Sequence, residues 1–271
     1  MSTKIPVYDL AGTVVKELDP PVVFRIGVRE DIIHRVFVHQ FTHRLQPKGR
    51  YPRAGRDKSA EFFGVGLGLA RVPRIKHGPL RGTAAIVTMA RGGRRPHVTT
   101  PEKKIYKRIN RKEVKLATAY AVAATGVREL VERRGHIVDE VLYIPLVVSD
   151  ELETIGKTSV LMETLKILGL EPDINRVKEN VKRRGGKSSW RGRGRRVRKG
   201  PLIVYAEDKG IYRAARNIIG VDVVSADDVS VIHLAPGGVP GRLTVWTESA
   251  LNRVVERLTP YVKVLRVVGS G

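Results

Sequence analysis

Apolar residues recur with a helical period in two long stretches of the chain. Residues 30–42 place five large apolar side chains on one stripe of a helix, namely Ile32, Ile33, Val36, Phe37 and Phe41. Glu30 and Asp31 fall in the first turn, where the helix dipole favours acids. The pattern returns at residues 111–134 through Leu116, Tyr120, Ala123, Val127 and Leu130. We therefore predict helices over 30–42 and 111–134, the second ended by Gly135.

Strand and helix patterns alternate through most of the remaining chain. Residues 141–148 form a nearly continuous apolar run, as expected of a strand covered on both faces. Further strands are predicted at 202–205, 221–224 and 243–246, and further helices at 158–168, 208–218, from 227, and at 247–258. Asp208 and Thr247 can accept hydrogen bonds at helix starts, and Pro260 follows the last helix. The alternation predicts an α/β, Rossmann-like body with a mainly parallel sheet and helices on both faces.

Two segments do not fit this pattern. Residues 44–111 contain nine glycines and six prolines with few apolar runs, and residues 180–200 are dense in arginine. Such charge density cannot be buried, so each segment is expected to order on a partner. We predict a globular body from residues 1–43 and 112–271, a long extended loop at 44–111 (the first basic segment), and a second basic loop at 180–200 (the second basic segment). Each arm of the long loop could span several tens of ångströms, at about 3.3 Å per residue.

The net charge of +23 is confined to these two segments. Residues 41–112 hold 19 Lys and Arg against three acids, and residues 180–199 hold ten Lys and Arg and no acid. The remaining 21 basic and 24 acidic residues leave the body close to neutral. So much local positive charge disfavours a compact state unless a polyanion neutralises it. The absence of cysteine excludes disulfides, thiolate metal sites and cysteine nucleophiles.

Both basic segments interleave the residue types that bind RNA. Arginine and lysine bind phosphates, glycine lets a backbone approach closely, and aromatic rings stack on unpaired bases. The first segment has Tyr51, Phe62 and Phe63 among its cations, and the second has Trp190. The alternatives are solvated, disordered charge runs, or a nuclear targeting signal in the second segment.

Three patterns resemble catalytic or ligand sites but lack the context that such sites need. The glycines of residues 64–68 are too closely spaced for a dinucleotide loop, and no predicted strand precedes them. His39 and His43 have a zinc-binding spacing without a glutamate between them or a third ligand nearby. Asp227 and Asp228 favour a helix start more than an acid/base pair. We expect no enzymatic activity, no cofactor and no metal.

Four stretches resemble the archaeal and eukaryotic branch of the fourth large-subunit ribosomal protein family, in matching order across essentially the whole chain. They are residues 64–76 (GVGLGLARVPRIK), 89–94 (MARGGR), 200–220 (GPLIVYAEDKGI and RNIIG), and 234–250 (LAPGG and WTESA). Leu67 stands where members often carry a basic residue, and Ile219 where a proline is common.

The resemblance implies a structural protein that binds large-subunit ribosomal RNA and is needed for subunit assembly and translation. Its long loop would line the nascent-peptide exit tunnel from about residue 64 to 95. The implied tunnel tip is Arg71, Val72, Pro73, Arg74, Ile75, Lys76 and His77. The implied partners are ribosomal RNA, neighbouring ribosomal proteins including the twenty-second of the large subunit, and the passing nascent peptide. No homo-oligomer is expected.

The RNA-binding residues predicted from charge, glycine content and resemblance lie in both segments. In the first they are Arg50, Arg53, Arg56, Arg71, Arg74, Lys76, Arg81, Arg91, Gly92, Gly93, Arg94, Arg95, Lys103, Lys104 and Arg108. In the second they are Trp190, Arg191, Arg193, Arg195, Arg196 and Arg198. The sequence shows neither a signal peptide nor an apolar run that could span a membrane, so we expect a cytoplasmic protein within the ribosome.

Two other functions stay open at this point. An RNA-modifying or nucleotide-dependent enzyme would carry its site at the carboxyl ends of the strands, where the loops after residues 148, 205 and 224 offer only scattered acids. A free regulatory RNA-binding protein would bind a transcript that imitates ribosomal RNA.

Overall fold

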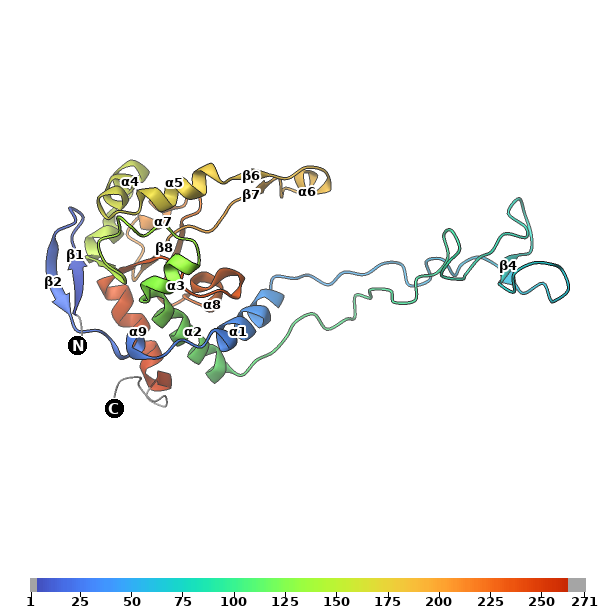
Figure 1. Ribbon diagram of the computed structural model, residues 1–271, viewed down its shortest axis with the longest axis horizontal. Coiled ribbons are helices and arrows are strands. Elements are labelled where there is room, and N and C mark those ends of the chain that lie inside the picture. Colours follow the sequence, from blue (N-terminus) through green and yellow to red (C-terminus); the bar gives the residue numbers. More distant parts are fainter. Residues whose placement is uncertain (1–3, 263–271) are drawn as a thin grey trace. The chain divides into compact units, whose positions relative to one another are not determined.

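The computed structural model describes residues 4–262 and divides into two compact units (Figure 1). One unit, the body, comprises the residues up to Phe41 and those from Arg108 onward. The other, here called the loop unit, is Thr42–Lys107. No helix among the described residues is long and apolar enough to cross a membrane.

A six-stranded sheet forms the centre of the body, in the order β2-β1-β5-β10-β8-β9. The strands are β1 (Ile5–Tyr8), β2 (Val14–Leu18), β5 (Leu146–Val148), β8 (Leu202–Tyr205), β9 (Asp222–Ser225) and β10 (Thr244–Thr247). Only the edge strand β2 is antiparallel to its neighbour. Parallel strands need covered faces, because the connections between them bring helices across the sheet.

Alternate side chains of the central strands enter two separate cores. Val147, Val204 and Trp246 belong to one core. That core includes residues of α1 (Glu30–Thr42), α2 (Arg111–Thr125), α8 (Val231–Leu234), α9 (Glu248–Val262) and the 3-10 helix η1 (Val22–Arg25). Val148 and Ile203 belong to the other. It includes residues of α3 (Arg128–Arg133), α4 (Thr158–Ile167), α5 (Glu171–Glu179), α7 (Ile211–Ala215) and η2 (Asp150–Thr154). The predicted α/β class with helices on both faces is confirmed.

The predicted continuous helix over residues 111–134 is wrong. Helix α2 ends at Thr125, and α3 starts at Arg128 after an extended residue, Val127. A Cβ on Gly126 would come within 2.8 Å of the Phe24 ring, so only glycine allows this close packing at the break. Gly135 follows α3, as expected of a residue that ends a helix.

Other predicted boundaries also need correction. The strand predicted over 141–148 is only Leu146–Val148, because Pro145 has no N–H for a ladder. Asp208 does accept hydrogen bonds from the amides of Gly210 (3.0 Å) and Tyr212 (3.3 Å), yet α7 spans only Ile211–Ala215. No helix starts at residue 227, and α8 begins at Val231. Pro260 lies inside α9 near its end, where one missing N–H is tolerated. Strands β1 and β2 and helix α5 were not predicted.

The loop unit folds back on itself through backbone hydrogen bonds rather than running extended throughout. Strand β3 (Ala60–Glu61) pairs with β4 (Arg74–Ile75), and the chain after β4 turns back to pair Arg74 with Ala84. The amide of Ile75 donates to Thr83 at 3.1 Å, and that of Gly82 donates to Ile75 at 2.9 Å. Ala85 is the one hydrophobic residue of the unit that is buried. The loop unit therefore has local structure without a hydrophobic core.

The two tryptophans give a test of where the stability resides. Trp246 is fully buried in the sheet, whereas Trp190 is 85% exposed. We expect Trp246→Ala to lower the free energy of unfolding by about 3–5 kcal/mol, because it leaves a large cavity. Trp190→Ala should change it by no more than about 0.5 kcal/mol. Denaturant unfolding followed by circular dichroism measures both, and equal losses would contradict this assignment of the core.

Candidate nucleic-acid interface

The second basic segment forms a short antiparallel hairpin. Strand β6 (Lys182–Arg183) pairs with β7 (Arg195–Arg196), and helix α6 (Lys187–Trp190) lies between them (Figure 1). The amide of Arg184 donates to Gly194 at 2.8 Å, and that of Arg193 donates to Ser188 at 2.9 Å. We call residues 182–196 the basic hairpin. Its tip holds Trp190 in solvent, where a planar ring is free to stack on a base.

All but one of the cations of this segment lack an acidic partner in the described part of the chain. Of the ten Lys and Arg in residues 180–199, only Lys199 forms an ion pair, with Asp222 at 2.7 Å. The nine others are exposed. They are Lys182, Arg183, Arg184, Lys187, Arg191, Arg193, Arg195, Arg196 and Arg198. The prediction included the last five of these arginines and omitted Lys182, Arg183, Arg184 and Lys187, although the same charge run contained them.

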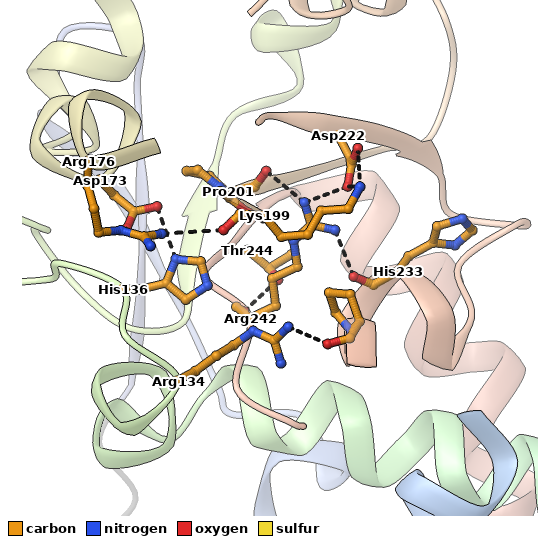
Figure 2. A network of polar contacts seen from close by, with 12 residues as sticks. Arg134, His136, Asp173, Arg176, Lys199, Pro201, Asp222, His233, Arg242 and Thr244 are labelled. Carbon is orange, nitrogen blue, oxygen red and sulfur yellow. Dashed lines mark hydrogen bonds and ion pairs between the residues drawn. The ribbon is translucent and has the colours of Figure 1, made fainter. Parts of the chain in front are cut away.

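A buried arginine anchors the point where the hairpin returns to the sheet. Arg242 is fully buried and donates to the carbonyls of Gly200 and His233, each at 2.9 Å, and to the Asp222 carboxylate at 2.7 Å (Figure 2). Burial lowers the pKa of Arg242, but a guanidinium keeps its proton at neutral pH. Burial raises the pKa of Asp222, and the charges of Arg242 and Lys199 outweigh it, so the pKa stays below its ordinary value. Asp222 thus joins the hairpin exit to β10.

A second cluster anchors the entry to the hairpin. Asp173 on α5 accepts hydrogen bonds from the Arg176 Nε at 2.9 Å and the Ile137 amide at 3.1 Å, and contacts His136 Nδ1 at 3.0 Å. Arg176 also donates to the Lys199 carbonyl at 3.3 Å, which links entry and exit (Figure 2). Burial lowers the pKa of His136, and its bond to Asp173 offsets only part of that effect. His136 is therefore neutral at pH 7 and donates its Nδ1 proton to Asp173.

Asp173 remains ionised in this cluster. Burial raises its pKa, but hydrogen bonds from His136 and Arg176 more than compensate and leave the pKa below its ordinary value. A buried carboxylate with this many donors is held in one position. The base of the basic hairpin is therefore fixed on both sides.

The loop unit presents most of its cations to solvent. Of its sixteen Lys and Arg, Arg53 pairs with Asp57 at 3.1 Å, Lys76 pairs with Glu61, and Arg74 donates to the Gly82 carbonyl at 2.6 Å. The other thirteen have no bonded partner among the described residues. The predicted residues Arg50, Arg56, Arg71, Arg81, Arg91, Arg95, Lys103 and Lys104 are exposed in this set, and Arg94 is half-buried. Arg108, the last residue predicted for this segment, is exposed at the edge of the body.

Two residues predicted to contact RNA, Arg74 and Gly93, make contacts that stabilise the loop unit itself. Arg74 closes the turn that starts at β4 through its bond to Gly82. A Cβ on Gly93 would lie 1.9 Å from the Val87 carbonyl oxygen, so glycine is required there by the unit's own packing. Gly92 has a positive φ of 67° and is exposed. The sequence analysis assigned Arg74 and Gly93 to RNA alone, because these internal contacts are not visible in the sequence.

The loop unit also exposes an uncharged apolar run that the prediction overlooked. Residues 62–70 contain no charged side chain, and Phe62, Val65, Leu67 and Leu69 are each more than half exposed. Apolar side chains gain no favourable contact with phosphates, whereas they can pack against another protein or a base. The interruption of the charge pattern was visible in the sequence.

The patterns that resembled other sites have structural explanations. No helix follows residues 64–68, so the glycine run is not a dinucleotide loop. The His43 ring stacks on Tyr106 at 4.3 Å between centroids, and the described residues include no cluster of three metal-ligating side chains. Asp227 accepts a hydrogen bond from Arg257 through its carbonyl and does not start a helix.

At the carboxyl ends of strands β8 and β10, the side chain of Glu153 occupies the hydrogen-bonding groups. Glu153 is buried and accepts hydrogen bonds from the amides of Ala206 (2.6 Å) and Glu207 (3.1 Å) and from the Thr247 hydroxyl (2.7 Å). In doubly wound nucleotide-binding folds, ligands bind at this edge of the sheet. Here the amides that follow β8 are already satisfied, which argues against an enzyme site.

Comparison with known proteins is consistent across the chain. Residues 17–257 match the ribosomal protein L4/L1 family. A large ribosomal subunit protein uL4 from Saccharolobus solfataricus is 45% identical over 260 residues, which are 96% of this chain and 96% of that protein. A protein of the same description from Saccharolobus islandicus is 46% identical over 254 residues, 93% of this chain and 94% of its own. The similarity includes the body and both basic segments.

The Arg242 anchor predicts a large loss of stability on substitution. Arg242→Met removes the buried guanidinium, leaves the carbonyls of Gly200, Pro201 and His233 without this donor and leaves Asp222 paired with Lys199 alone, which should cost about 3–5 kcal/mol of unfolding free energy. Arg128→Met is the matched control, because Arg128 forms an exposed pair with Glu132 and a long hydrogen bond of 3.5 Å to the Val138 carbonyl, and should cost about 1 kcal/mol or less. Chemical denaturation measures both variants. Similar small losses would show that the buried network does not hold the hairpin base.

Proposed function

The chain belongs to the ribosomal protein L4/L1 family, and from that premise we propose that its two basic segments bind large-subunit ribosomal RNA. Membership makes the protein a structural component of the large ribosomal subunit and not an enzyme. Its role is therefore to position RNA and neighbouring proteins during subunit assembly and translation, in the ribosomes of the cytoplasm.

One observation carries the proposal. The loop unit buries a single hydrophobic residue, Ala85, while thirteen of its cations have no partner among the described residues. Without a core, such a segment cannot offset the conformational entropy lost on folding. Phosphates that surround it on several sides supply the missing free energy through charge-assisted hydrogen bonds and counterion release.

The proposed RNA contacts are positional. In the loop unit and at its edge the arginines and lysines predicted from the sequence bind phosphates, and Gly92 allows a close backbone approach. Arg74 also acts indirectly, because its bonds to the carbonyls of Gly82 and Ala70 shape the turn that presents Arg71 and Arg81. Gly93 acts indirectly as well, because it packs against the carbonyls of Val87 and Ala90 in the turn next to Arg91 and Arg94. In the second segment, Arg191, Arg193, Arg195, Arg196 and Arg198 bind phosphates and Trp190 stacks on an unpaired base.

The tunnel assignment is also part of this proposal. Residues 64–95 line the nascent-peptide exit tunnel, with residues 71–77 at the tip. The tight pairing of residues 73–75 with 82–85 supports it, because a narrow double strand can be wrapped by RNA. The apolar run at 62–70 suits a neighbouring protein, which we propose is the twenty-second of the large subunit. The nascent peptide would pass the tip without stable binding.

The proposed division of the chain follows from these roles. Residues 1–43 and 112–271 form the body, and residues 44–111 are an insertion that serves RNA binding. The separate compact unit Thr42–Lys107 supports this division.

RNA binding across a salt series tests the proposal. We expect replacement of Arg191, Arg193, Arg195, Arg196 and Arg198 by glutamine to flatten the plot of log affinity against log salt by about 3.5–4.5, at about 0.7–0.9 per lost phosphate contact. Replacement of Arg71, Arg81, Arg91 and Arg95 should flatten it by about 2.8–3.6. Filter binding to purified large-subunit ribosomal RNA measures both.

The control for this series carries four charge changes on the body, as many as the second variant, at Lys4, Lys16, Lys166 and Lys209. Each of these lysines already pairs with an acid. The control should keep the parent slope. If both test variants kept it as well, the basic segments would not be the RNA site.

The tunnel tip can be tested by crosslinking, because the chain has no native cysteine. A His77→Cys variant assembled into ribosomes should crosslink to a nascent chain that carries one cysteine within the tunnel. Val160→Cys on the body is the control and should give no product. Equal yields from both positions would remove residues 71–77 from the tunnel.

A further inference from the structure

The register of the basic hairpin distributes its charge over two faces. Lys182 lies directly opposite Arg196, and Arg183 lies directly opposite Arg195. In an antiparallel pair, residues directly opposite project from the same face, and successive residues project from opposite faces. One face of the ribbon therefore carries Lys182 and Arg196, and the other carries Arg183 and Arg195.

Both faces are open. The four side chains are exposed, and no acid in the described part of the chain pairs with any of them. A ribbon that lay flat on one anionic surface would need cations only on the face turned toward that surface. Here both faces carry an opposed pair of cations, and the two-stranded sheet has no further strand on either edge.

The charges also oppose the pairing that places them. Like charges directly across an antiparallel pair destabilise it, and each face brings two cations together in this way. At ionic strengths near 0.1 M the screening length is about 10 Å, longer than the separation across the strands, so salt alone does not remove the repulsion. An anion on one face would relieve only one of the two pairs.

We propose that the basic hairpin inserts between two separate segments of RNA backbone, with each face binding the phosphates of one segment. This inference rests on the proposed function and deepens it, because it makes the second basic segment a bridge between two parts of the RNA rather than a clamp on one. The hairpin base, fixed by Arg242 and by Arg176, holds the ribbon so that both faces stay accessible. Arg183 and Lys182, which precede the arginine-rich run, are as necessary to the bridge as Arg195 and Arg196.

Two paired variants separate the faces. The first is Lys182→Gln with Arg196→Gln, and the second is Arg183→Gln with Arg195→Gln. A quadruple variant combines them, and Lys4→Gln with Lys166→Gln is the charge-matched control on the body, where both lysines have acidic partners. Because the four hairpin residues lie outside both hydrophobic cores, thermal unfolding of every variant should match the parent.

Hydroxyl-radical footprinting on large-subunit ribosomal RNA gives the readout. Nucleotides protected by the parent and exposed in the quadruple variant define the footprint of the hairpin. We expect this footprint to comprise two segments distant in the RNA sequence, with each paired variant losing one segment and keeping the other. Each pair should also flatten the salt dependence of binding by about 1.4–1.8.

Two results would overturn the bridge. If both paired variants lose the same nucleotides, the hairpin binds a single backbone, and RNA binding by the second segment still stands. If the quadruple variant keeps every protection and the parent slope, the four paired side chains do not contact RNA, and the paired strands of the hairpin face an acidic protein surface instead. Failure of the proposed function as a whole is a different result, in which the parent protein gives no specific footprint.

Discussion

Many cations of this protein have no acidic partner among its described residues, and their mutual repulsion determines where they can lie in the structure. Nine cations of the second basic segment and thirteen of the loop unit have no partner in the described chain, whereas the remainder of the sequence is slightly acidic. Exposed charges of one sign destabilise compact structure. The hydrophobic cores therefore lie in the body, whereas the unpaired positive charge lies in segments that contribute almost nothing to those cores.

The body serves this arrangement as a rigid support. Its sheet ends close to the base of the basic hairpin, where Arg242 binds Asp222 and three carbonyls while Asp173 binds Arg176 and His136. Buried ionic groups are costly unless fully bonded, and they are retained where they fix one geometry. In this protein they fix both ends of the basic hairpin on the body.

The same body shows how a fold common among enzymes can lack a ligand site. Its parallel strands end where nucleotide-binding proteins hold their ligands, but Glu153 occupies the amides that follow β8. That carboxylate joins β8, β10 and η2 by hydrogen bonds and stabilises the sheet edge instead. The surfaces that we propose bind RNA lie instead in the loop unit and the basic hairpin. One architecture often serves unrelated roles in this way.

The α/β class, the position of both basic segments and most central strands could be predicted from the order of residues alone, because hydrophobic period and net charge are local properties. Helix α1 and strand β8 matched their predicted bounds for this reason. Tertiary structure decided what depends on contacts distant in sequence. At the break between α2 and α3, Gly126 packs closely against the ring of Phe24, which is about a hundred residues earlier in the chain. Arg74 and Gly93 have internal roles because the loop unit turns back on itself. Arg242 is buried because it bonds to carbonyls about forty residues away. The distribution of charge over both faces of the basic hairpin could likewise not be predicted from composition. It depends on the register in which β6 pairs with β7.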